Sequence, residues 1–327
     1  MSLLTKIAVS AALFVAIPAT IALGLIVSDR PKSDLRAEGE GLDFSVLQRA
    51  EMPELQAYTA RDGAALGYRQ WLSGRDDAPL LVAVHGSGWH SAQFAGLGSA
   101  LAEAGIDVIA PDLRGHGPDP QRRGDVDYIG QFEDDLADLI TQTAREGQSV
   151  VMLGHSSGGG LVIRFAGGKH GAMIDRAVLL APFVQYDAPT TRPNSGGWAN
   201  VLTRRVIGLS MLNMAHVTAL NHLPVIQFRF PSSVLDGPLG QTATRAYSYR
   251  LNTGFSPRRD WQAEIAALPP FVLIAGAQDE AFVAEQYEPT FSAITDRGEY
   301  ALTGATHLSV VDDPETLQRV IAFIGAD

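Results

Sequence analysis

Short apolar runs alternate with longer amphipathic stretches along most of this chain, and this alternation constrains the fold more than any other feature. Runs such as PLLVAV at 79–84 and RAVLL at 176–180 have the length and composition of buried strands. The stretches between the runs repeat their apolar residues at helical spacing. Strands that alternate with helices are typical of a mostly parallel sheet with helices on both faces, so the sequence predicts an α/β domain.

The predicted elements follow one another from residue 55 to the C-terminal end. The first two strands flank Arg61-Asp62-Gly63, a turn signal, and therefore predict an antiparallel hairpin. Eight strands are predicted, at 55–59, 65–72, 79–84, 106–110, 149–153, 176–180, 271–275 and 299–302. Five helices are predicted between them, at 91–103, 131–145, 157–167, 280–294 and 314–324.

The alternation is interrupted once, between Pro182 and about Pro269. A connection of this length is too long for a loop in a compact domain. We therefore predict a core made of residues 55–182 and 269–327, and a partly helical cap over residues 183–268 at the carboxyl edge of the sheet. The apolar segment 201–230 carries Met211 and Met214, which suits either a flexible lid for an acyl chain or simple packing of the cap onto the core.

Residues 1–30 form the most apolar part of the chain. No residue from Ile7 to Val27 is charged, and this run has about the length needed to cross a bilayer as a helix. The run continues past Thr20-Ile21-Ala22, which resembles a signal-cleavage site, and this favours an uncleaved anchor over a secretory signal. We predict a single-pass membrane protein, or a secreted or periplasmic one after cleavage, with a polar linker over residues 31–54.

Charge and cysteine content restrict the partners and the chemistry. With 36 acidic and 25 basic residues the net charge is −11, which disfavours nucleic acid as a partner. The chain has no cysteine, so a thiol nucleophile, disulfides and zinc-thiolate sites are excluded.

A G-x-S-x-G motif, Gly154-His155-Ser156-Ser157-Gly158, lies between a predicted strand and a predicted helix. A nucleophilic serine at such a sharp turn needs neighbours without bulky side chains, which Gly154 and Gly158 provide. Ser156 is midway between the outer glycines and is the predicted nucleophile. The backbone N–H of Ser157 opens the helix and is predicted to face a developing oxyanion.

The second oxyanion donor is expected from His85-Gly86-Ser87-Gly88, the loop after the first central strand. We predict that the backbone N–H of Ser87 fills this role, with Gly88 as the reserve. His85 is predicted to stabilise the loop rather than to act in catalysis.

A nucleophilic serine needs a base, and the base needs an acid that orients it. The chain order for a G-x-S-x-G serine is serine, acid, histidine. His307 follows the last predicted strand, and Asp279 ends FVLIAGAQD at the carboxyl end of another strand. We predict His307 as the base and Asp279 as the acid, with the adjacent Glu280 as the reserve acid.

Five segments together resemble α/β-hydrolases of the monoacylglycerol lipase and lysophospholipase group. They are HGSG at 85–88, DLRGHG at 112–117, GHSSG at 154–158, and the loops of Asp279 and His307. The resemblance implies an α/β-hydrolase fold and hydrolysis of carboxylic esters through an acyl-serine, without metal or organic cofactor. The expected substrates are small-molecule esters, either monoacylglycerol- or lysophospholipid-like or other medium-sized esters.

Two departures limit what the resemblance implies. Ser157 stands where the lipases usually carry Met or another residue, and the cap has no motif that aligns, so substrate identity is not implied. The same triad also serves cofactor-free perhydrolases and carbon–carbon bond hydrolases. The fold can also serve a ligand receptor without enzymatic activity.

Overall fold

The computed structural model describes residues 2–33, 35–37, 42–44 and 51–325. Within the predicted linker over 31–54, the stretches 38–41 and 45–50, with Gly39 and Gly41, therefore lie outside the described residues.

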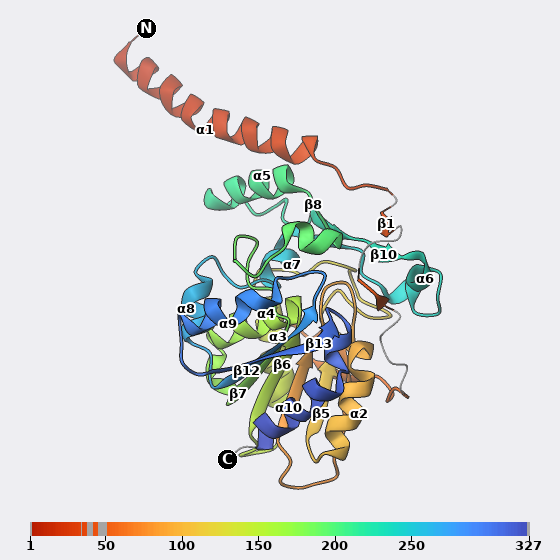
Figure 1. Cartoon of the computed structure of the whole chain (residues 1–327). Coiled ribbons are helices and arrows are strands. Elements are labelled where there is room, and N and C mark those ends of the chain that lie inside the picture. The colour runs from red at the N-terminus through yellow and green to blue at the C-terminus, as the bar shows by residue number, and fades with distance from the viewer. Residues whose placement is uncertain (1, 34, 38–41, 45–50, 326–327) are drawn as a thin grey trace.

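A single twisted sheet forms the centre of the described chain (Figure 1). Its strands are β2 (Gln56–Thr59), β3 (Ala65–Trp71), β4 (Leu80–Val84), β5 (Asp107–Pro111), β6 (Val150–His155), β7 (Arg176–Leu180), β12 (Phe271–Gln278) and β13 (Gly298–Thr306). They are ordered β13-β12-β7-β6-β4-β5-β3-β2. The pairs β2–β3 and β3–β5 are antiparallel and the others are parallel, which confirms the predicted eight-stranded, mostly parallel sheet.

Helices cover both faces of this sheet (Figure 1). Helix α2 (Ala95–Glu103) contacts α10 (Pro314–Gly325), whereas α3 (Gln131–Thr143) contacts α4 (Ser157–Ala166) on the other side. The residues of β4 are fully buried between these layers, as expected for a central parallel strand.

The predicted helix over 280–294 is wrong in its first half. Helix α9 spans only Tyr287–Ser292. The segment before it turns because the Asp279 Oδ1 accepts the backbone N–H groups of Ala281 and Phe282, at 2.8 and 2.7 Å. An Asx-type turn of this kind competes with a helical start.

The cap between β7 and β12 contains a small antiparallel sheet as well as helices. The sheet has the order β11-β9-β8. These strands are β8 (Ala199–Val201), β9 (Pro224–Phe228) and β11 (Ala246–Ser248), and the helices are α5 (Thr203–Met214), α6 (Ser232–Leu235), α7 (Tyr249–Gly254) and α8 (Trp261–Ala266). Met214 is 85% exposed at the end of α5, so it does not line a lid over the serine.

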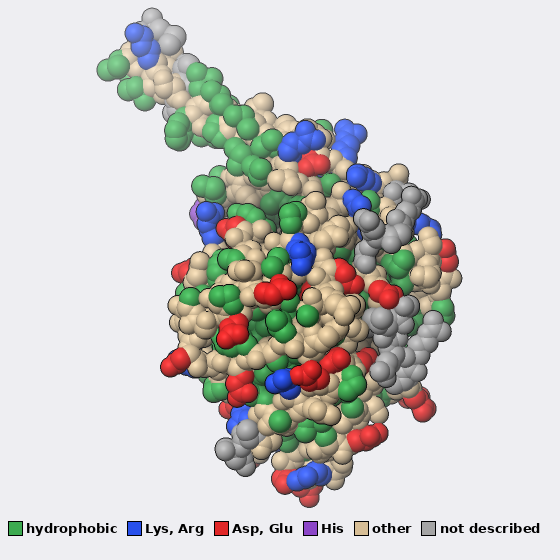
Figure 2. Space-filling model, viewed as in Figure 1, with side chains coloured by type: hydrophobic (Ala, Val, Ile, Leu, Met, Phe, Trp, Pro, Cys, Tyr) green, Lys and Arg blue, Asp and Glu red, His purple; other side chains and the backbone are tan. Residues whose placement is uncertain are grey.

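Helix α1 (Leu3–Ser28) projects from the cap (Figure 1). Its C-terminal half packs on α5, where Ala22 and Ile26 are buried together with Leu209 and Leu212. Hydrophobic side chains cover much of the projecting part (Figure 2). Among the residues that the structure describes, no helix combines the length and hydropathy required to cross a membrane, so the predicted transmembrane anchor is not supported.

Candidate active site

Ser156 lies at the sharp turn between β6 and α4. Its backbone has φ 56° and ψ −122°, a conformation that non-glycine residues rarely adopt and that stores strain. A Cβ atom on Gly154 would lie 2.3 Å from the carbonyl oxygen of Gly158, and one on Gly158 would lie 2.1 Å from that of Val84. The two glycines are therefore required for the close approach of strand and helix.

The structure brings Ser156, His307 and Asp279 together. The Nε2 of His307 lies 3.1 Å from the Ser156 Oγ, and its Nδ1 lies 2.9 Å from the Asp279 Oδ2. Asp279 follows β12 and His307 follows β13, so neighbouring parallel strands deliver both side chains to the carboxyl edge of the sheet. Both side chains are buried.

The environment of Asp279 favours its ionised form. Burial raises the pKa of the carboxyl, but the charge and hydrogen bond of His307, with the backbone N–H groups of Phe282 and Ala281, lower it more. The net pKa lies below its ordinary value. An ionised Asp279 accepts the Nδ1–H of His307, which leaves Nε2 as the basic nitrogen that faces the serine hydroxyl.

Glu280, the reserve acid, lies elsewhere in the site. Its Oε2 accepts the backbone N–H of His307 at 2.9 Å. This carboxylate therefore holds the loop of the histidine, while Asp279 contacts the imidazole.

The predicted oxyanion residues Ser87 and Ser157 lie next to each other. Their hydroxyl oxygens are 2.5 Å apart. The backbone N–H of Gly88, the reserve donor, donates to the Tyr247 hydroxyl at 2.5 Å, and this hydroxyl donates to the Nε2 of His116 at 2.7 Å. Gly88 is thus engaged by the cap, and the arrangement favours Ser87 over Gly88.

A buried polar chain beside the site was not predicted from the sequence. The ring of His155 donates its Nε2–H to the carbonyl oxygen of His307 at 2.8 Å, and its Nδ1 accepts from the Gln93 side chain at 2.6 Å. The Gln93 Oε1 accepts the backbone N–H of Gly86 at 3.0 Å. Burial and the nearby His307 lower the pKa of His155 to about 3, so the ring is neutral. The only sequence signal was the place of His155 inside the G-x-S-x-G motif.

His85 and His170 have structural partners. His85 donates its Nδ1–H to the carbonyl oxygen of Gly86, and its Nε2 accepts the backbone N–H of Leu113. This agrees with the structural role predicted for His85. The Nε2 of His170 lies 2.8 Å from the Asp134 Oδ1.

The cavity at Ser156 is small. It has a volume of about 20 Å³, and Ser156, His307 and Ser87 are among the residues that line it. The other lining residues are largely apolar: Leu42, Phe44, Trp89, Trp198 and Leu308, with Gly86, Gln93 and His155.

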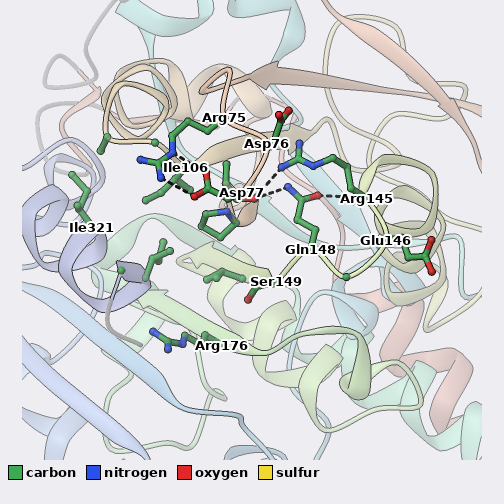
Figure 3. Close-up of a pocket in the computed structure, with 18 residues that line it drawn as sticks. Arg75, Asp76, Asp77, Ile106, Arg145, Glu146, Gln148, Ser149, Arg176 and Ile321 are labelled. Carbon is green, nitrogen blue, oxygen red and sulfur yellow. Dashed lines mark hydrogen bonds and ion pairs between the residues drawn. The ribbon is translucent and has the colours of Figure 1, made fainter.

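A larger hollow of about 540 Å³ lies at the amino ends of β4, β5, β6 and β7, at the opposite edge of the sheet from Ser156 (Figure 3). Two of its arginines pair with nearby acids, Arg75 with Asp77 and Arg145 with Asp107, and the third, Arg176, donates to the carbonyl oxygen of Phe323. Within the described part of the chain, no group of three His, Asp or Glu side chains is placed to hold a metal ion.

Comparison with known proteins agrees with the architecture. Human monoglyceride lipase is 29% identical over 156 residues, which is 47% of this chain and 50% of the lipase. A non-heme chloroperoxidase of Kitasatospora aureofaciens is 35% identical over 124 residues, 38% of this chain and 42% of that protein. The matched part of the chain thus spans a third to a half of the length of such relatives.

The structure of a soluble variant of monoglyceride lipase from Saccharomyces cerevisiae superimposes with a TM-score of 0.62. The match covers 84% of this chain and 94% of that one, at 18% identity, and at that identity the likeness shows the fold alone. These findings confirm the resemblance to α/β-hydrolases of the monoacylglycerol lipase type. A family model described as serine aminopeptidase, S33, matches residues 76–249, more than half of the chain. The protein therefore belongs to this Hydrolase_4 family of α/β-hydrolases.

Proposed function

We propose that the protein hydrolyses carboxylic esters, with Ser156 as nucleophile, His307 as general base and Asp279 as the acid that orients it. The observation that carries the proposal is the continuous chain of contacts, 3.1 Å from Ser156 to His307 and 2.9 Å from His307 to Asp279. Side chains spaced in this way can transfer a proton while the serine attacks.

The reaction then proceeds in two halves. The Ser156 Oγ bonds to the ester carbonyl carbon as His307 takes the hydroxyl proton, and the N–H groups of Ser87 and Ser157 stabilise the oxyanion. The carbon–oxygen bond of the ester breaks, and the alcohol leaves with the proton from His307. Water, deprotonated by the same imidazole, then attacks the acyl-serine, and the carboxylic acid is released as Ser156 regains a proton.

We propose monoacyl esters with an apolar chain as the substrate class. Monoglyceride lipases occur among both the sequence relatives and the structural neighbours. The apolar residues of the cavity lining, with Trp89 and Trp198, suit an acyl chain better than a charged group.

The direct experiment is turnover of p-nitrophenyl acetate and of a monoacylglycerol by the full chain and by Ser156→Ala. We expect hydrolysis by the parent and a loss of at least about a thousandfold in the variant. Ser149→Ala is the matched control, because Ser149 precedes the same strand at its other end and bonds Asp175. Equal turnover by Ser156→Ala and the parent would refute the proposal.

Perhydrolysis is a related activity that should be measured beside ester hydrolysis, since a chloroperoxidase is one of the sequence matches. Adding hydrogen peroxide and acetate to the same assay separates the two activities. We expect ester hydrolysis to exceed peracid formation, because apolar side chains line the cavity.

We propose that the protein is located at a membrane through its N-terminal segment, or that it is secreted or periplasmic after cleavage of this segment. The side chains that favour an apolar contact are exposed on α1 and include Leu4, Phe14 and Val15. Fractionation of expressing cells, with N-terminal sequencing of the product, tests this proposal.

A further inference from the structure

Two residues from outside both core and cap lie over the small cavity at Ser156. Leu42 and Phe44 belong to the segment that joins α1 to the core, and both line the cavity. The Phe44 ring lies 5.9 Å from Trp89, 5.5 Å from Trp198 and 5.3 Å from Phe230, measured between ring centroids. Phe44 therefore occupies an aromatic cage beside the nucleophile.

The walls of this cage come from the parts of the chain expected to bind an acyl chain. Trp89 follows the oxyanion loop directly, and Trp198 and Phe230 belong to the cap. All three are buried, at 8%, 7% and 0% exposure. Without Phe44, the cage would offer a continuous apolar surface that begins beside Ser87 and Ser156.

The space left in the presence of Phe44 is too small for an acyl chain. The cavity of about 20 Å³ holds on the order of one water molecule. Pockets that bind organic ligands usually measure about 300–1,000 Å³. A substrate with a long chain therefore has to displace the Phe44 ring, whereas a short acyl group needs much less space.

Among the described residues of this segment, Lys32 and Arg36–Ala37 connect it to the cap. The backbone N–H and C=O of Lys32 bond the Gln227 side chain, each at 2.8 Å. Strand β1 (Arg36–Ala37) then pairs with β10 (Phe230–Pro231) in parallel. Two-residue strands and exposed ion pairs such as Arg36 with Asp236 contribute little stability.

We propose that Phe44, assisted by Leu42, fills the acyl subsite and determines the size of the acyl group that reaches Ser156. This inference rests on the proposed ester hydrolysis. It makes the N-terminal segment, in addition to the cap, a determinant of substrate specificity.

The test compares Phe44→Ala with the parent on p-nitrophenyl acetate, octanoate and dodecanoate. We expect kcat/KM on the two longer esters to rise by about tenfold or more, and acetate to change by less than about threefold. Phe44→Trp should shift the profile the other way, toward acetate. Leu42→Ala provides a smaller enlargement of the same subsite, should Phe44→Ala fail to fold.

Leu72→Ala is the matched control, because Leu72 is an exposed aliphatic residue next to Trp71, which pairs with Val108 toward the opposite edge of the sheet. We expect its chain-length profile to equal that of the parent. Parent-like profiles in Phe44→Ala and Leu42→Ala, with acetate still hydrolysed, would overturn the assignment of Phe44. No acetate hydrolysis by the parent would instead contradict the proposed function.

Discussion

The carbonyl oxygen of His307 accepts a hydrogen bond of 2.8 Å from the ring of His155, the residue that precedes the nucleophile. Through Gln93, the same ring is connected to the backbone N–H of Gly86 in the oxyanion loop. The proposed base, the sharp turn at Ser156 and the loop that holds Ser87 thus share one buried network. Because each member is satisfied, the network fixes their relative positions.

Breaking this network should lower kcat more than it weakens substrate binding. Gln93→Leu leaves the N–H of Gly86 and the Nδ1 of His155 without partners, so we expect kcat to fall about tenfold with KM nearly unchanged. The free energy of unfolding should fall by about 1–3 kcal/mol. Steady-state kinetics and urea unfolding measure both effects. Gln148→Leu is the control, since Gln148 bonds Ala78 at the other edge of the sheet. A larger effect on KM than on kcat would contradict the positioning role of Gln93.

Asp279 and Glu280 should respond very differently to conversion into amides. Asp279→Asn removes the acceptor that fixes the His307 tautomer, and kcat should fall by about a thousandfold to ten-thousandfold. Glu280→Gln keeps an oxygen for the N–H of His307, so the loss should be under about tenfold. Ester hydrolysis by the two variants gives the comparison. The reverse order of effects would make Glu280 the acid.

The protein should lose stability as the pH falls below about 6.5. Burial, as the largest cause, lowers the pKa of His85 and His90 to about 4 and that of His155 to about 3. The unfolded chain then binds protons that the folded protein excludes, so stability present above the unfolded pKa decreases as the pH drops toward the folded pKa. Each histidine contributes up to about 1.4 kcal/mol per pH unit in this window. Thermal unfolding from pH 7 to pH 4 checks this, and a constant Tm would speak against neutral buried rings.

Gly158→Ala should strongly destabilise the fold. The new Cβ would lie 2.1 Å from the carbonyl oxygen of Val84, and backbone atoms have little room to retreat. We expect a loss of about 3 kcal/mol or more, together with loss of activity. Gly325→Ala meets nothing within 4 Å and should change stability by less than about 0.5 kcal/mol. Chemical denaturation of both variants provides the comparison, and equal midpoints would show that the turn at Ser156 tolerates a side chain at Gly158.

The sequence predicted the core well because its signals were local. Each apolar run predicted as a strand forms one, and the order of Ser156, Asp279 and His307 placed all three at ends of parallel strands. The cap was harder, since the short strands β8, β9 and β11 form only through pairing between distant segments. The position of Phe44 could not be predicted either, because its contacts with Trp198 and Phe230 depend on how the cap folds back.

The most direct measurement of the central claim is the site and rate of labelling by an alkyl fluorophosphonate. Peptide mapping by mass spectrometry should find a single adduct, on Ser156, and His307→Ala should slow its formation by at least about a thousandfold. An adduct on another residue, or an equal labelling rate in His307→Ala, would contradict the account.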